Sequence, residues 1–327
     1  MAIIHVTEAT VGLPNSGRLS GTDGDLVGIL DVALPLNGWA IEYTSGNARV
    51  YRPGTGNRFR LYVNDDSAVS GDARLATVRG CENASAASEA GLVDPFPTIS
   101  QCAATVANWH KSTTANTTAR LFDILVGESF VIYSCNFGSG TNRWELEIFG
   151  DASPALLGDS YNTLVSVRGI ASPTFVTAEW YDSWGTGSAD AFPTVCCLFW
   201  ARSYDGTVKS SQSAVASIFN GLGIGSVGAN FPQALNGPTT GIDTIKLPLR
   251  CLGSTTNSES SSLALPIRGW FPNLLLPQHG GRGVVNTRDT YSNSAVPGFQ
   301  GQIVCADNTA ASAFIVMQTN DGWSPPT

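Results

Sequence analysis

Charged residues are scarce in this chain of 327 residues. Asp, Glu, Lys and Arg together make up 13% of it, which is about half the share found in ordinary globular proteins. The chain has only two Met, and it contains no long charged amphipathic run. Helical proteins usually depend on such runs for their solvent-facing surfaces. These absences disfavour a fold built mainly from helices.

The cysteines and histidines lack the spacing of a metal site or a disulfide framework. Seven Cys are scattered along the chain without a C-x-x-C pair, and there are only three His. Such a set leaves little material for a zinc site, and an odd number of Cys argues against a complete set of disulfides. We therefore expect free, buried thiols, no metal and no cofactor. Assembly in a reducing cytoplasm is compatible with this.

The chain also lacks a basic surface and a long apolar run. Its formal net charge of −8 argues against a general nucleic-acid binder, which needs concentrated positive charge. The N-terminal MAIIHVTEAT has no basic region and no long apolar stretch, and no 18-residue apolar run follows. We expect no nucleic-acid partner, no signal peptide and no membrane span.

Short segments with strand signals are plentiful. Each is rich in β-branched or aromatic residues and is bounded by Gly, Asn, Pro or Asp. They are residues 39–44, 48–52, 58–65, 74–80, 128–137 and 143–151. Residues 52–57 and 135–144 contain the turn residues of hairpin loops. The sequence predicts a mostly β fold, with antiparallel strands in sandwich-like or barrel-like lobes and few short helices.

One of these segments, residues 58–65, shows the alternation of a half-buried strand. Phe59, Leu61 and Val63 would share one face of the strand. Arg58, Arg60 and Tyr62 would then occupy the opposite, solvent-facing side.

Helical signals are confined to two segments, residues 97–112 and residues 212–223.

Two short motifs recur in the chain in the same order. VRG at 78–80 precedes DPFPT, and VRG at 167–169 precedes DAFPT. This echo suggests an N-terminal β-rich domain over residues 1–175 and a C-terminal β-rich, loop-rich domain over residues 176–327, or one continuous unit.

A glycine pattern resembling a dinucleotide fingerprint occurs late in the chain. Gly223, Gly225 and Gly228 have the G-x-G-x-x-G spacing, and Asp243 follows twenty residues after the first glycine. The fingerprint needs a strand before the glycines and a helix after them. Here the preceding segment has helical character, and Pro232 opposes a following helix. The pattern therefore indicates a flexible loop.

Two groups of carboxylates are candidates for chemistry. Glu145 and Glu147 share one face of a strand, where they could act as the acid and base of a glycosidase. A solvated face is the favoured interpretation, because Leu146 and neighbouring apolar residues would lie on the buried side.

The second group is Asp65, Asp66 and Asp72, which could offer oxygen ligands to calcium. The expected Glu at the end of a twelve-residue loop is missing, so an Asx-rich turn is favoured. The three His are not accompanied by a G-x-S-x-G elbow, and we expect no catalytic triad.

An aromatic cluster is the best candidate for a contact surface. Trp180, Tyr181 and Trp184 lie close together in EWYDSWGTG, beside Asp182. Clustered aromatic rings can stack on sugars or anchor a protein interface, although packing in a core is their commoner role.

Several segments together form a recognisable set of motifs: 38–66, 74–82, 94–98, 109–120, 148–164, 201–206 and 267–279. The set resembles a family of virion structural proteins from tailed double-stranded DNA bacteriophages and their prophages. The resemblance covers approximately residues 25–280. One departure is Cys81, which stands where the pattern has an aromatic residue.

The resemblance implies a particle component and not an enzyme. We expect a protein made in the host cytoplasm that assembles into the virion, as a multi-copy component of the tail or neck. Its partners would be copies of itself and other virion proteins. A capsid decoration protein and a glycan-binding tail appendage that uses Trp180, Tyr181 and Trp184 remain open, as does a glycosidase that uses Glu145 or Glu147.

Overall fold

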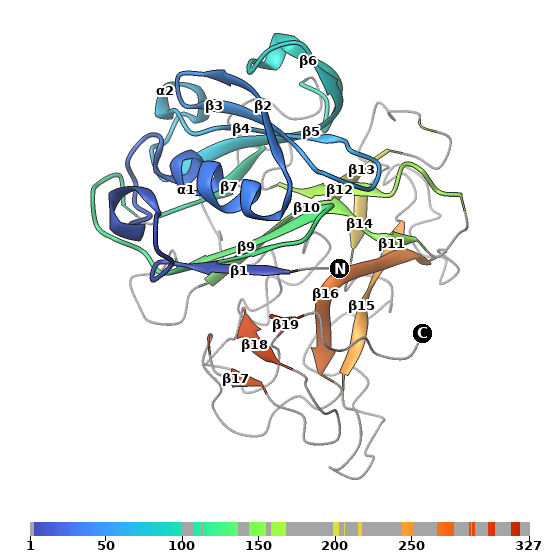
Figure 1. Ribbon diagram of the computed structural model, residues 1–327. Helices are drawn as coiled ribbons and strands as arrows, with labels where there is room; N and C mark the ends of the chain where they lie inside the picture. The colour runs from blue at the N-terminus through green and yellow to red at the C-terminus, as the bar shows by residue number, and fades with distance from the viewer. Residues whose placement is uncertain are drawn as a thin grey trace, which may run out of the picture.

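The described part of the protein is mostly β, as the sequence predicts. The computed structural model (Figure 1) describes residues 3–99, 107–112, 114–136, 144–154, 158–167, 199–202, 206, 215–217, 244–251, 267–277, 288, 290–291, 300–304 and 315–320. These residues form two antiparallel sheets and a few short helices.

The smaller sheet has six strands in the described residues. Five of them follow the order β2-β3-β4-β5-β6, and β7 pairs with β5 as well. Their bounds are β2 Ala40–Ser45, β3 Ala48–Arg52, β4 Arg60–Asn64, β5 Leu75–Ala84, β6 Leu92–Phe96 and β7 Asn108–His110. Because β5 is ten residues long, β7 pairs with its first half and β6 with its second.

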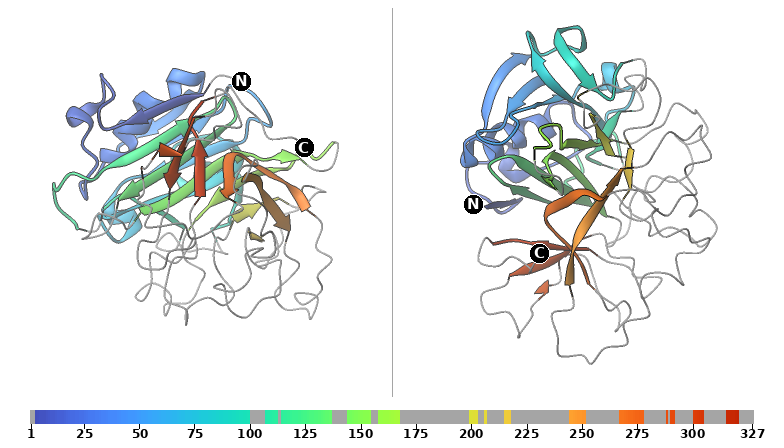
Figure 2. Two further views of the ribbon diagram at one scale, coloured as in Figure 1. Left: turned by 90° about the horizontal axis from the view of Figure 1, so that it is seen from below. Right: turned by 90° about the vertical axis from the view of Figure 1, so that its right-hand side faces the viewer.

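The larger sheet contains thirteen described strands. Its order is β1-β8-β9-β10-β12-β13-β14-β15-β16-β19-β18-β17, and β11 pairs with β16. The first strands are β1 Ile4–Thr7, β8 Phe122–Val126, β9 Phe130–Asn136, β10 Trp144–Asp151, β11 Ser153–Pro154, β12 Thr163–Ser166, β13 Phe199–Ala201 and β14 Val215–Ser217. The remaining ones are β15 Thr244–Cys251, β16 Ile267–Pro277, β17 Thr290–Tyr291, β18 Gly301–Val304 and β19 Ile315–Gln318. In Figures 1 and 2 the strands β15–β19 extend away from the smaller sheet.

Helix α1, Asp25–Ala33, is the longest helix among the described residues. It begins after Gly24, whose left-handed backbone (φ 87°) suits glycine. It ends where the short helix η2, Leu34–Asn37, carries the chain to a second left-handed residue, Gly38. The other short helices are η1 Pro14–Gly17, α2 Ser67–Ser70 and η3 Glu89–Gly91.

The two sheets and α1 share one hydrophobic core. Figure 1 shows α1 between the smaller sheet and strands β1 and β9 of the larger one. A single cluster of buried residues includes Leu26, Ile29 and Leu30 from α1, Tyr51, Leu61 and Val78 from the smaller sheet, and Ile124, Tyr133 and Phe149 from the larger one. This arrangement is a sandwich of two antiparallel layers, and it positions the polar groups described below.

Two tryptophans join the layers through both rings and hydrogen bonds. The Trp109 Nε1 on β7 donates to the carbonyl of Ser166 on β12 at 2.7 Å, and its ring stacks on Tyr133 of β9. Trp39 donates from Nε1 to the Gly127 carbonyl at 2.8 Å. Each indole thus buries a large apolar surface and also satisfies a buried backbone carbonyl.

All six strand segments that the sequence indicates contain strands, although some bounds differ. The prediction that Tyr62 faces solvent is wrong. Tyr62 is buried in a second apolar cluster with Val50 and Cys81, so β4 has apolar neighbours on both faces. A free, buried thiol is confirmed for Cys81, where burial raises the pKa to about 12, and Cys135 is buried as well, with its Sγ donating to the His110 carbonyl at 3.3 Å.

Both helix predictions are wrong where the structure describes the segments. Asn108–His110 form strand β7, paired with Leu75–Thr77. Val215–Ser217 form strand β14, which pairs with β13 and β15. The division near residue 175 falls outside the described residues, so the two-domain organisation stays a prediction.

Candidate functional site

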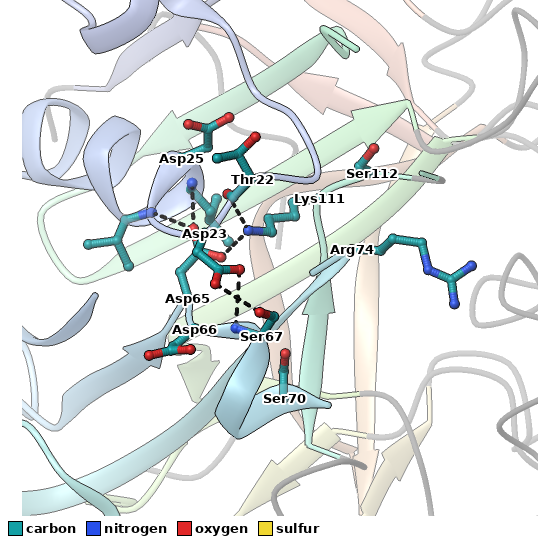
Figure 3. Close-up of polar contacts among 12 residues, drawn as sticks. Thr22, Asp23, Asp25, Asp65, Asp66, Ser67, Ser70, Arg74, Lys111 and Ser112 are labelled. Carbon is teal, nitrogen blue, oxygen red and sulfur yellow. Dashed lines mark hydrogen bonds and ion pairs between the residues drawn. The ribbon is translucent and has the colours of Figure 1, made fainter. Parts of the chain in front are cut away.

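The most completely buried ion pair among the described residues joins Lys111 and Asp65. Lys111 directly follows β7, and Asp65 directly follows β4. Nζ of Lys111 contacts Oδ1 of Asp65, and both side chains have 0% exposed surface. Figure 3 shows the pair beside the first turn of α1.

Asp65 is held by α1 as well as by the lysine. Its second oxygen, Oδ2, accepts hydrogen bonds from the backbone N–H of Leu26 at 2.8 Å and of Val27 at 3.4 Å. These are free donors at the helix N-terminus, where Gly24 has no side chain to cap them. The Asp65 carbonyl also accepts from the Gly24 N–H at 2.9 Å. Asp65 therefore acts as a cap supplied by a strand that is distant in sequence.

Lys111 is held in place by its backbone and by the end of its side chain. Its backbone N–H donates to the Arg74 carbonyl at 3.0 Å, which extends the pairing of β7 with the start of β5. Its Nζ donates to the Thr22 carbonyl at 2.7 Å as well as to Asp65. The ammonium group thus faces one carboxylate and one carbonyl in a site closed to solvent.

Burial dominates the acidity of this site. It raises the pKa of Asp65 to about 7, although the charge and hydrogen bond of Lys111 and the two helix N–H groups oppose the shift. Near neutral pH the carboxyl group therefore binds a proton much more readily than an exposed aspartate does.

The three aspartates considered for calcium bind different partners. Asp65 pairs with Lys111, whereas Asp66 caps α2 by accepting from the Ala68 N–H at 2.9 Å. Asp72 forms an ion pair with Arg74, whose hydrogen bonds and charge outweigh burial and lower the Asp72 pKa. The described residues contain no group of three or more His, Cys, Asp or Glu side chains placed to hold a metal. The local Asx turn is confirmed at Asp66.

A second polar cluster joins the first strand to a residue near the end of the chain. Arg288 donates to both carboxylate oxygens of Glu8, at 2.8 and 2.7 Å, and to Asp123 at 2.8 Å. His5 contacts the other oxygen of Asp123 at 2.9 Å. Burial opposes ionisation of Glu8, but the hydrogen bonds and charge of Arg288, together with backbone hydrogen bonds, outweigh it and lower the Glu8 pKa.

The interpretation of Glu147 as a solvated carboxylate is wrong. Glu147 is 2% exposed, and its Oε2 accepts a hydrogen bond from the Ser166 hydroxyl at 2.7 Å. Leu146 and Ile148 are buried as expected, so both faces of β10 are covered here. The side chain of Glu145 lies outside the described residues.

Other sequence candidates also fall outside the described part. Trp180, Tyr181 and Trp184 lie there, as does the glycine pattern from Gly223 to Gly228. Among the described residues, no helix combines the length and apolar character needed to cross a bilayer. The chain matches no protein-family model, and a comparison with curated proteins finds no match.

Sequence reasoning missed the pairing of Lys111 with Asp65. The sequence draws attention to Asp65 only through its neighbours Asp66 and Asp72, and to Lys111 only as the end of a predicted helix, where the described residues form strand β7. One signal was available. The chain has three lysines, and Lys111 directly follows the aromatic Trp109 and His110 in a segment of low charge.

Proposed function

We propose that this chain is a structural component of a tailed-bacteriophage particle, present in several copies in the tail or neck. The observation that carries the proposal is the set of motifs that resembles virion structural proteins. Four of those motifs, residues 38–66, 74–82, 94–98 and 109–120, overlap β2–β7, which are the strands of the smaller sheet in the described residues.

The charge distribution supports a structural role. Ionisable groups in the described part bind one another and hold elements together: the buried pair Lys111 and Asp65, and half-buried Arg288 with Glu8 and Asp123. Asp, Glu, Lys and Arg make up only 13% of the chain, so few charges are left for its surface. Neutral polar surfaces of this kind suit contacts with neighbouring subunits.

The edges of the sheets provide a second line of support. In the described residues, β2 ends the smaller sheet and β1 ends the larger one. Edge strands carry unpaired N–H and C=O groups, which a strand from another chain can complete. On β2, Ile41 is 40% exposed and adds apolar surface to this edge.

Immunogold labelling of purified particles tests the proposal and its location. An antibody raised against the chain should label the tail or neck. Labelling spread over the capsid would replace this location with a decoration role, and particles that carry no label would overturn the proposal.

A binding assay separates the proposal from the glycan-binding alternative. The purified chain is incubated with polysaccharide from the host surface, beside a variant in which Trp180 and Trp184 are both changed to Ala. We expect no retention of either protein. Retention of the native chain that is lost in the variant would favour a receptor-binding appendage.

A further inference from the structure

We propose that Lys111 and Asp65 become joined by an amide bond between Nζ and Cγ, which makes this site an internal covalent cross-link. The inference goes beyond the proposed function and does not depend on it. It rests on the contact between the two side chains, on their complete burial and on the donors around the carboxyl group (Figure 3).

The placement of Lys111 is unusual for a simple ion pair. Lysine is almost never fully buried unless it is paired, and the chain has only three lysines, of which this one has 0% exposed surface. A buried ion pair seldom stabilises a fold more than apolar residues of similar size, because both charges lose their hydration. An amide bond removes both charges and hence this cost.

The surroundings of Asp65 suit attack on its carboxyl carbon. Nζ of Lys111 already touches Oδ1, which is bonded to that carbon. The other oxygen, Oδ2, faces the N–H groups of Leu26 and Val27 at the positive end of α1. When Nζ adds to the carbon, negative charge develops on Oδ2, and these donors are positioned to stabilise it.

The proton that the reaction must first move passes directly between the two side chains. The ammonium group of Lys111 gives one proton to Oδ1 of Asp65, which leaves a neutral amine and a neutral acid. Because the Asp65 pKa is raised to about 7, this transfer costs less free energy than transfer to an ordinary aspartate would. The Thr22 carbonyl, an acceptor of Nζ at 2.7 Å, holds the amine in place.

The covalent step then follows without any further reactant. The nitrogen lone pair forms the C–N bond, and the electrons of the C=O bond move to Oδ2. When the C=O bond re-forms, the bond from carbon to Oδ1 breaks, and Oδ1 leaves as water with a second proton from nitrogen. One ammonium and one carboxylate become one amide and one water. Burial keeps other water from reversing the reaction, and the fixed geometry replaces a high concentration of reactants.

The bond would link the ends of two strands that both pair with β5. Asp65 follows β4 and Lys111 follows β7, and 46 positions separate the two residues. A cross-link here closes a loop that contains β5 and β6, so it constrains the unfolded chain in the way that a disulfide does.

Mass spectrometry of the purified full-length chain under denaturing conditions tests the proposal. We expect a mass lower by one water than the sequence requires. Trypsin cuts after Arg and unmodified Lys, so it should release residues 61–74 joined to residues 80–120, with Lys111 uncut. Fragment spectra should place the junction between Asp65 and Lys111.

The matched control is Lys111→Arg, which keeps a positive charge but has no primary amine. It should show the full mass of its sequence and no joined peptides. The proposal is overturned if the native chain has its full mass and yields residues 61–74, 80–111 and 112–120 as separate peptides. It is equally overturned if the missing water persists in Lys111→Arg, because the water would then have left another site.

Discussion

At the scale of single residues, the burial of Lys111 decides what surrounds it. A buried ammonium group that has lost its hydration needs hydrogen-bond acceptors. The Lys111 ammonium group donates to the Asp65 carboxylate and to the Thr22 carbonyl. Asp65 in turn accepts hydrogen bonds from the helix N–H groups of Leu26 and Val27. Both side chains therefore belong to one network that ties the start of α1 to the ends of two strands.

Replacing Lys111 by Met should strongly destabilise the protein. The change leaves Asp65 buried without a counter-charge, and breaking one side of a buried pair typically costs about 3–5 kcal/mol. Chemical unfolding measures the loss. The double variant Lys111→Met, Asp65→Asn should be more stable than Lys111→Met, because the neutral amide can still accept from the Leu26 N–H. A loss below about 1 kcal/mol for the single variant would contradict this account.

The same single variant should be sensitive to pH. In the folded chain, before any bond to Lys111 forms, the Asp65 pKa is already raised to about 7, mainly by burial, and removing Lys111 takes away an interaction that lowers it. The folded state then binds a proton that the unfolded chain has released, so stability should fall as the pH rises from the usual aspartate pKa toward and beyond 7. Unfolding curves at several pH values measure this, with the double variant as the control that lacks the carboxyl group.

Replacing Arg288 by Met should raise the pKa of Glu8. Arg288 donates to both carboxylate oxygens of Glu8 and is the main group that opposes burial, so its loss leaves burial opposed only by backbone hydrogen bonds. A group with a lowered pKa stabilises the fold above its unfolded pKa, and this contribution is lost as the pH falls through the folded value. NMR titration of the Glu8 carboxyl measures the change. Asp72, paired with Arg74, should titrate unchanged, and an unaltered Glu8 would argue against the contact.

At the scale of elements, local sequence predicts strands better than it predicts helices in this chain. The strands carry β-branched and aromatic runs between turn residues, which are local signals. Strand β7 was mistaken for helix because its structure depends on pairing with Leu75–Thr77, some thirty residues away. Helix α1 was missed because buried residues lie on most of its sides, which removes the amphipathic contrast.

Burial of both faces explains the two errors about side-chain exposure. Tyr62 and Glu147 occupy positions that alternate with apolar residues, a pattern typical of strands with one solvated face. A second layer of apolar residues covers Tyr62, and Ser166 satisfies Glu147. The cover comes from residues distant in sequence, so the local pattern contains no sign of it. The site at Lys111 and Asp65 was missed for the same reason.

The hydrogen bond from Trp109 to the Ser166 carbonyl joins the two layers of the sandwich. Replacing Trp109 by Phe keeps an aromatic ring beside Tyr133 but removes the donor to the Ser166 carbonyl. An unsatisfied buried carbonyl costs about 1–3 kcal/mol, and we expect a loss of this size in chemical unfolding. Tyr43→Phe on β2 is the control and should change stability by less than about 0.5 kcal/mol. Equal stability of Trp109→Phe and the control would show that the hydrogen bond between the layers does not contribute to stability.

At the scale of the whole molecule, low charge and extended antiparallel sheets favour a protein whose surface is covered by neighbours. Among the described residues, β1 and β2 stand at the ends of the two sheets, where a strand from another chain could pair with them. The mostly β fold could be read from composition and strand signals, whereas the placement in a virion rests on resemblance and remains our proposal.

The central claim is that the chain is a multi-copy part of a phage particle. The most direct measurement counts its copies in purified particles by mass spectrometry, using isotope-labelled peptides of this chain and of the other particle proteins as standards. The account predicts several copies of the chain in every mature particle. Particles that are complete and infectious without the chain would contradict it.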